Sequence, residues 1–132
     1  MTQTSPRIRR FFYISGVFNF VAVGLILIMV RVAPQVFGVV PLQGSQLLFV
    51  DLFGLLAAGF GLGYVLAGFQ PWKYWPFILL GALCKLGVFA IVAAYFSRND
   101  AGVIMLVLAS GDGLFAVLFL YLLATSNFTL ER

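Results

Sequence analysis

Histidine is absent from all 132 residues of the chain, and cysteine occurs only once. Histidine is the commonest metal ligand and supplies the base of most catalytic triads, so its absence excludes bis-histidine haem ligation and histidine-containing triads, and most zinc or copper sites with them. The single cysteine, Cys84, excludes an intrachain disulfide. We therefore expect no cofactor, and in particular neither haem nor zinc.

Charged side chains are also scarce: they make up 9% of the residues, whereas 63% are hydrophobic. A soluble domain carries about 25% charged residues. A bilayer core about 30 Å thick needs about 20 apolar residues per helix, and four stretches are long enough. The sequence therefore predicts one all-α domain over residues 1–132, a polytopic four-helix bundle surrounded by lipid. The predicted spans are residues 11–30, 47–69, 76–96 and 103–124.

The net charge of +4 comes from cations at the predicted membrane edges. In a soluble protein this charge would suggest nucleic acid, but cytoplasmic loops of membrane proteins are enriched in lysine and arginine. We expect no nucleic-acid partner, both chain ends in the cytoplasm, and a bacterial inner membrane as the location. One predicted side carries Arg7, Arg9, Arg10, Lys73 and Arg132, and the other carries Arg31 and Arg98.

Polar residues interrupt the apolar spans at a few positions, most clearly at Lys85 in "LLGALCKLGVFAIV". With a helical rise of about 1.5 Å per residue, Asn19 lies about 12 Å, Lys85 about 13 Å and Asp112 about 18 Å from the cytoplasmic edge. A lone charge at the bilayer centre costs about 2.5–3.5 kcal/mol, so such groups find partners. Lys85 and Asp112, on consecutive antiparallel helices, are predicted to pair.

Two interpretations of this pair stay open. It can be an internal ion pair that only fixes the helix register. Alternatively it handles protons or ions, because desolvation disfavours both charged forms and so allows a proton to pass between them. Asn19 is either a contact between helices or part of a ligand site. Asp51 lies about 27 Å deep, near the outer face, where it is either an interfacial residue paired with Arg31 or Arg98, or the entrance to a pathway.

The second span is rich in small residues, in "GLLAAGFGLGYVLAG". Small side chains let a neighbouring helix backbone approach closely, and Gly59 and Gly63 form a GxxxG pair. Together with Gly54 and Ala58 they predict a packing face, which we assign to oligomerisation in preference to contacts within the chain. Tyr64 follows this pair, and we expect its ring to lie at the cytoplasmic membrane interface.

The order of a basic head, "GFGLGY" in the second span, a lysine in the third and "GDGLFAVLF" in the fourth resembles small bacterial inner-membrane proteins of the DoxX-like kind. That resemblance implies a non-catalytic accessory role beside membrane oxidoreductases. The polar layer formed by Asn19, Lys85 and Asp112 favours a transport or channel component for protons, ions or a small solute. The alternative is an accessory or assembly subunit of a larger complex, and an enzyme is less favoured than either. We expect a homo-oligomer or membership of a larger membrane complex.

Overall fold

The computed structural model describes residues 5–125, which form four long helices and one short 3₁₀ helix. All four long helices are apolar and long enough to cross a membrane. The predicted all-α four-helix architecture is therefore confirmed. The helices are α1 (Pro6–Val32), α2 (Ser45–Phe69), α3 (Trp75–Ser97) and α4 (Val103–Thr125), and η1 (Pro34–Phe37) lies between α1 and α2.

Each helix runs slightly beyond its predicted span. The largest difference is in α1, which begins at Pro6, five residues before the apolar stretch. Proline suits the first turn of a helix because its missing N–H has no partner there in any case. Hydropathy marks only the segment inside the lipid, whereas the helix continues through the basic turn that precedes it.

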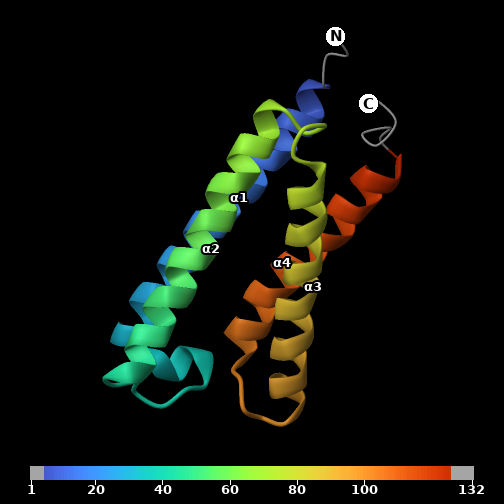
Figure 1. Cartoon of the computed structure of the whole chain (residues 1–132). Coiled ribbons are helices and arrows are strands. Elements are labelled where there is room, and N and C mark those ends of the chain that lie inside the picture. The colour runs from blue at the N-terminus through green and yellow to red at the C-terminus, as the bar shows by residue number, and fades with distance from the viewer. Residues whose placement is uncertain (1–4, 126–132) are drawn as a thin grey trace.

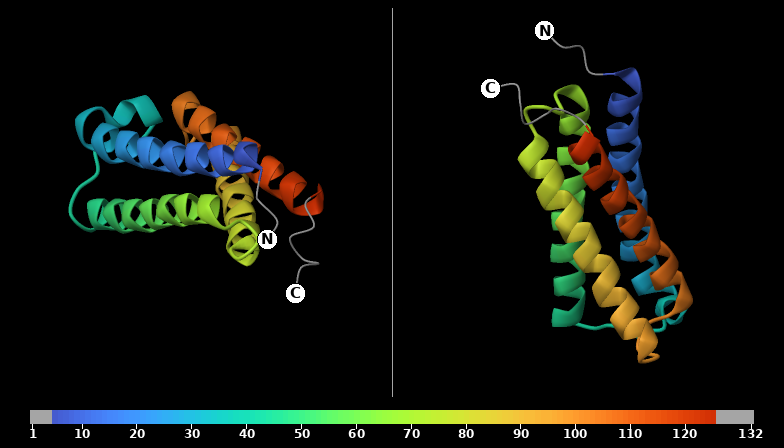
Figure 2. Two further views of the ribbon diagram at one scale, coloured as in Figure 1. Left: turned by 90° about the horizontal axis from the view of Figure 1, so that it is seen from above. Right: turned by 90° about the vertical axis from the view of Figure 1, so that its right-hand side faces the viewer.

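The chain forms two antiparallel hairpins, α1 with α2 and α3 with α4 (Figures 1 and 2). The helices of each hairpin are packed closely together, whereas α2 and α3 touch over a short length only. Figure 1 shows the two hairpins meeting near the α2–α3 turn and separating toward the opposite end. The long helices of the two hairpins are therefore close at one end of the bundle and apart at the other, where η1 contacts α4.

The two ends of the bundle differ in charge. The end with the start of α1 and the α2–α3 turn carries Arg7, Arg9, Arg10 and Lys73 and, among residues 5–125, no acidic residue; we call it the basic end. The other, the loop end, carries Arg31, Arg98, Asp51 and Asp100. These are the charges from which the positive-inside rule predicts a cytoplasmic basic end. Arg132, which entered the predicted assignment, lies outside the described residues.

The apolar core fills the half of the bundle nearer the basic end. All four helices contribute to it, and its members are at most 1% exposed. Lipid gives little hydrophobic drive between helices, so this close packing is what holds the hairpins together. The core residues are Phe12, Tyr64, Ala67, Ile78, Ala82 and Phe119.

Candidate functional site: a lysine cluster beside a cavity

Lys85 lies inside the bundle with only 5% of its surface exposed. Its ammonium donates a hydrogen bond of 2.7 Å to Oδ1 of Asn19 and forms an ion pair with Oδ1 of Asp112. Both partners are residues that the depth estimate placed in the same layer. The structure thus brings Lys85, Asp112 and Asn19 together, as predicted.

Asn19 connects the cluster of Lys85, Asp112 and Asn19 to α2. Its Nδ2 donates a 2.9 Å hydrogen bond to the backbone carbonyl of Ala57 in α2. One residue from each of the four helices therefore takes part: Asn19, Ala57, Lys85 and Asp112. Interhelical hydrogen bonds of this kind are a principal stabilising contact between helices in lipid.

Close contact between α1 and α2 makes the Asn19 bond possible. A Cβ atom on Gly61 would lie 3.1 Å from the Cβ of Asn19 and 3.3 Å from the carbonyl oxygen of Gly16. A Cβ on Gly16 would in turn lie 2.9 Å from the carbonyl oxygen of Gly61. The two glycines therefore let the helix backbones approach until the Asn19 side chain reaches Ala57.

Three aromatic rings surround the ammonium of Lys85. Its Nζ lies 5.4 Å from the ring centroid of Tyr64, 5.7 Å from that of Phe18 and 5.9 Å from that of Phe115. A cation within about 6 Å of an aromatic face is attracted by the ring quadrupole, and more strongly when it is desolvated. The rings thus offset part of the cost of burying the charge.

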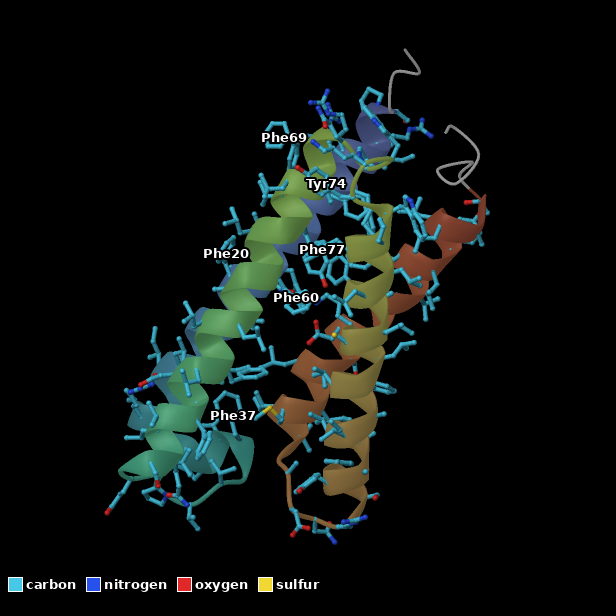
Figure 3. The ribbon with its side chains drawn as sticks, viewed as in Figure 1. Phe20, Phe37, Phe60, Phe69, Tyr74 and Phe77 are labelled. Atoms are coloured by element: carbon cyan, nitrogen blue, oxygen red, sulfur yellow. The ribbon has the colours of Figure 1, made fainter. Side chains whose placement is uncertain are left out.

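The expectation that Tyr64 lies at the membrane interface is wrong, because its side chain is only 1% exposed. The tyrosine turns inward, where Gly81 of α3 has no side chain to oppose its ring. Figure 3 shows Phe60 and Phe77 between α2 and α3, and these two rings stack at 5.5 Å on the same side of the bundle. The aromatic residues here form an interior wall.

Two adjoining cavities lie beside the cluster. The smaller has a volume of about 170 Å³ and is lined by Asn19, Tyr64, Cys84, Lys85 and Asp112, among others. The larger, about 480 Å³, extends to the loop end. Both are partly open, and Asp112 borders both of them. The ion pair is therefore buried but not sealed, since 23% of the Asp112 side chain is exposed.

Asp51 is not part of the buried polar layer. Its side chain is 54% exposed and forms a 2.5 Å ion pair with Arg31 at the loop end. This position fits the interfacial interpretation, including the predicted partner Arg31. Asp51 lies in the second turn of α2, beyond the apolar core, and so it remains accessible to headgroups or water.

The small residues predicted as one face of α2 have different surroundings. Gly54 is covered by Leu27 of α1 and Gly63 by Phe77 of α3, while Ala58 is half-buried. Gly59 has no neighbour within 4 Å of its Cβ position. Gly54 and Gly63 therefore pack within the chain, and only Gly59 is open. Gly63 is covered and Gly59 is not, because α3 inclines away from α2 toward the loop end (Figure 1).

Sequence reasoning missed several residues of this site, namely Gly16, Phe18, Ala57 and Phe115 together with the inward face of Tyr64. One usable signal is helical spacing: Gly16 precedes Asn19 by three residues and Phe115 follows Asp112 by three. Residues at this spacing share a helix face. Cys84 is exposed and borders the smaller cavity, which no sequence pattern indicated.

Comparisons with protein-family models, curated proteins and solved structures find no match to this chain. The fold and the site therefore define the class: a small four-helix membrane protein with a lysine–aspartate pair beside a cavity between two hairpins.

Proposed function

We propose that this chain is a transport component of a bacterial inner membrane, which handles protons, ions or a small solute at Lys85, Asp112 and Asn19. One observation carries the proposal: the ion pair borders a cavity. A pair that only fixed helix register would be best enclosed by side chains, because solvent or ligand access weakens it. Intramembrane ionisable residues that face a cavity are typical of substrate and ion pathways.

The shape of the bundle supports the same proposal. The packed core closes the cluster on the side of the basic end, while the cavities lead from it toward the loop end. The two hairpins contact each other over a short length of α2 and α3 and through η1 at the loop end, so few contacts oppose a movement of one hairpin against the other. Transporters expose a central site to each side in turn by movements of this kind.

Cys84 provides a direct test, because it is the single cysteine of the chain and borders the smaller cavity. The experiment measures modification of Cys84 by a charged, membrane-impermeant methanethiosulfonate in right-side-out and in inside-out vesicles. We expect modification from both sides, because a transport site must open to each in turn. Modification from neither side, or from one side only, would contradict the transport proposal.

Two control variants calibrate this measurement in a Cys84→Ser background. Arg98→Cys places a thiol at the loop end and Lys73→Cys places one at the basic end. Each control should react from one side only, which establishes that the vesicles are sealed and oriented. A control that reacts from both sides shows that the vesicles leak. Modification of Cys84 is therefore measured only in vesicles in which each control reacts from one side.

A second candidate is an accessory or assembly subunit, and the open surface of α2 favours it. Gly59 is uncovered, and the larger cavity is partly open, so a neighbouring helix finds both a close approach and a groove. The DoxX-like resemblance points to an oxidoreductase complex as the partner. Purification from native membranes tests this candidate: a stoichiometric larger complex supports it, whereas the chain alone or its homo-oligomer contradicts it.

Self-association has its own matched test at the small residues of α2. If a second copy packs at Gly59, Gly59→Leu should lower the oligomer mass measured by light scattering in detergent. Leu114→Ala, on the exposed surface of α4, is the control and should leave the mass unchanged. An unchanged mass for Gly59→Leu would exclude this face as the contact.

A further inference from the structure

The two cavities adjoin each other between the hairpins and have five lining residues in common. Ala22 and Ile26 of α1, Phe53 of α2, Val88 of α3 and Asp112 of α4 border both of them. Sites that hold small molecules have volumes of about 300–1,000 Å³, mostly apolar walls and a few convergent polar groups. The larger cavity, about 480 Å³, falls within this range, and the smaller one adds the polar groups.

We propose that this space binds a lipophilic alcohol, with its hydroxyl at Lys85 and Asp112 and its apolar body in the larger cavity. The proposal rests on the proposed function, since it names the chemical class of solute that the same site takes. Three properties of the site lead to it: its charge balance, its remaining hydrogen-bonding capacity and the nature of its walls.

Charge balance requires a neutral head group. The ammonium of Lys85 already has a carboxylate partner in Asp112, so the pair is neutral as a whole. Among residues 5–125, the smaller cavity is lined by no other lysine, arginine or acidic residue. A carboxylate or an amine bound here would add an uncompensated charge at membrane depth, which is costly.

The remaining hydrogen-bonding capacity favours a hydroxyl among the neutral heads. An ammonium has three donors, and Lys85 uses two, on Asn19 and Asp112. The second carboxylate oxygen of Asp112 receives no hydrogen bond from the residues that the structure describes. A hydroxyl can accept from the free ammonium proton and donate to this oxygen, whereas an ether or a ketone can only accept.

The walls of the larger cavity suit an apolar body. Apart from Asp112, every residue that borders it is apolar, among them Val30, Val92, Met105 and Leu108. Ordered water needs two to four polar partners, and these walls offer only Asp112. Hydrocarbon is the complementary occupant.

The η1 segment closes the larger cavity at the loop end. Phe37 is 2% exposed and borders the cavity, lying between the two hairpins in Figure 3. The segment is fixed to the second hairpin by a 2.7 Å hydrogen bond from the N–H of Gly102 to the carbonyl of Phe37. At this contact the backbone of Gly38, with φ of +74°, lies against that of Gly102, and a side chain on either would block it. The apolar body is thus covered at its far end.

Protection of Cys84 from alkylation by N-ethylmaleimide, measured on the full chain in lipid nanodiscs, tests the proposal. The probes are dodecanol, dodecyl methyl ether and dodecanoate, which share a tail and differ in the head. We expect dodecanol to protect Cys84 with an apparent Kd about tenfold lower than that of the ether, as one lost hydrogen bond to a charged group predicts. Dodecanoate should protect least.

Two variants test where the tail lies. Ala109→Phe and Val39→Trp each fill the larger cavity, from α4 and from the loop respectively, and neither position is a member of the ion pair. Both should raise the apparent Kd for dodecanol by at least about tenfold and leave Cys84 reactive in its absence. Val39→Trp lies outside the long helices, so it serves if Ala109→Phe does not fold.

Each other outcome overturns a part of the proposal. Equal protection by the ether excludes the hydroxyl, stronger protection by dodecanoate excludes the neutral head, and no protection by any probe excludes binding. The two-sided modification of Cys84 is measured without any probe. Failure of the alcohol site therefore leaves the result for the transport site unaffected, and the two failures are distinguishable.

Discussion

Asn19 and Lys85, 66 residues apart in the sequence, are joined by a 2.7 Å hydrogen bond in the interior of the bundle. The asparagine amide accepts from the lysine with its oxygen and donates to the Ala57 carbonyl with its nitrogen. It therefore connects the α1–α2 contact to the charged pair. The charge cluster depends on this helix contact, so a change in the α1–α2 spacing should affect the position of Lys85.

The first prediction concerns the spacing of α1 and α2. Gly61→Ala should lower the free energy of unfolding by about 1–3 kcal/mol, because the new methyl group would press on Asn19 and the Gly16 carbonyl and overpack the contact. Gly59→Ala is the matched control, since its Cβ meets nothing within 4 Å. It should leave stability unchanged or higher. Thermal unfolding of both variants in one detergent makes the comparison, and equal stability would contradict the close contact at Gly61.

The second prediction concerns Ser15, whose hydroxyl is fully buried and has no hydrogen-bond partner within residues 5–125. A buried hydroxyl without a partner costs about 1–3 kcal/mol. Ser15→Ala should therefore raise the free energy of unfolding by about 1 kcal/mol. The control is Ser110→Ala, because Ser110 is exposed and donates to the Leu106 carbonyl of its own helix. It should change stability by no more than about 0.5 kcal/mol.

A loss of stability in Ser15→Ala would contradict this account. It would show that the hydroxyl has a partner in the membrane, such as a bound water, a lipid or a second copy of the chain. Ser15 precedes Asn19 by one helical turn, so such a partner would lie close to the charge cluster.

The fold and the central pair could be predicted from the sequence because both follow from the cost of polar groups in lipid. Four apolar runs of sufficient length require four helices. A charge at membrane depth requires a partner, and two opposite charges at similar depth can pair with each other. Lys85 and Asp112 were identified in this way. Depth in the membrane follows directly from the residue number and the helical rise.

The orientation of each helix about its axis could not be predicted in the same way. A helix that is apolar on every side gives no signal of which face turns inward. The inward position of Tyr64 depends on Gly81 in another helix, and the opening at Gly59 depends on the inclination of α3. The cavities likewise result from how the two hairpins meet. Only the packed structure determines these features.

The third prediction concerns orientation in the membrane. Within residues 5–125 the basic end has four cations and no acidic residue, while at the loop end Arg31 is paired with Asp51. The positive-inside rule therefore predicts that the basic end faces the cytoplasm. A phosphatase that is active only outside the cytoplasm should be active when inserted in the turn at 98–101. Inserted in the turn at 70–74, it should be inactive. The reverse pattern would place the loop end, and with it η1, on the cytoplasmic side.

The fourth prediction concerns the charged pair itself. Lys85→Met or Asp112→Leu alone leaves one charge buried without its partner, which should lower the free energy of unfolding by roughly 3–5 kcal/mol. The double variant removes both charges and should recover most of this loss. The control cycle is Arg31→Met with Asp51→Leu, an exposed pair whose single changes should cost at most about 1 kcal/mol.

Thermal unfolding in one detergent gives the free energy of unfolding of each variant. Modification of Cys84 then separates the two interpretations of the pair. If the pair only fixes helix register, the double variant should fold and allow the same two-sided modification of Cys84 as the unchanged chain. If the pair is the transport site, the double variant should fold but lose the two-sided modification of Cys84. Equal instability of the single and double variants would instead show that Lys85 and Asp112 do not stabilise each other.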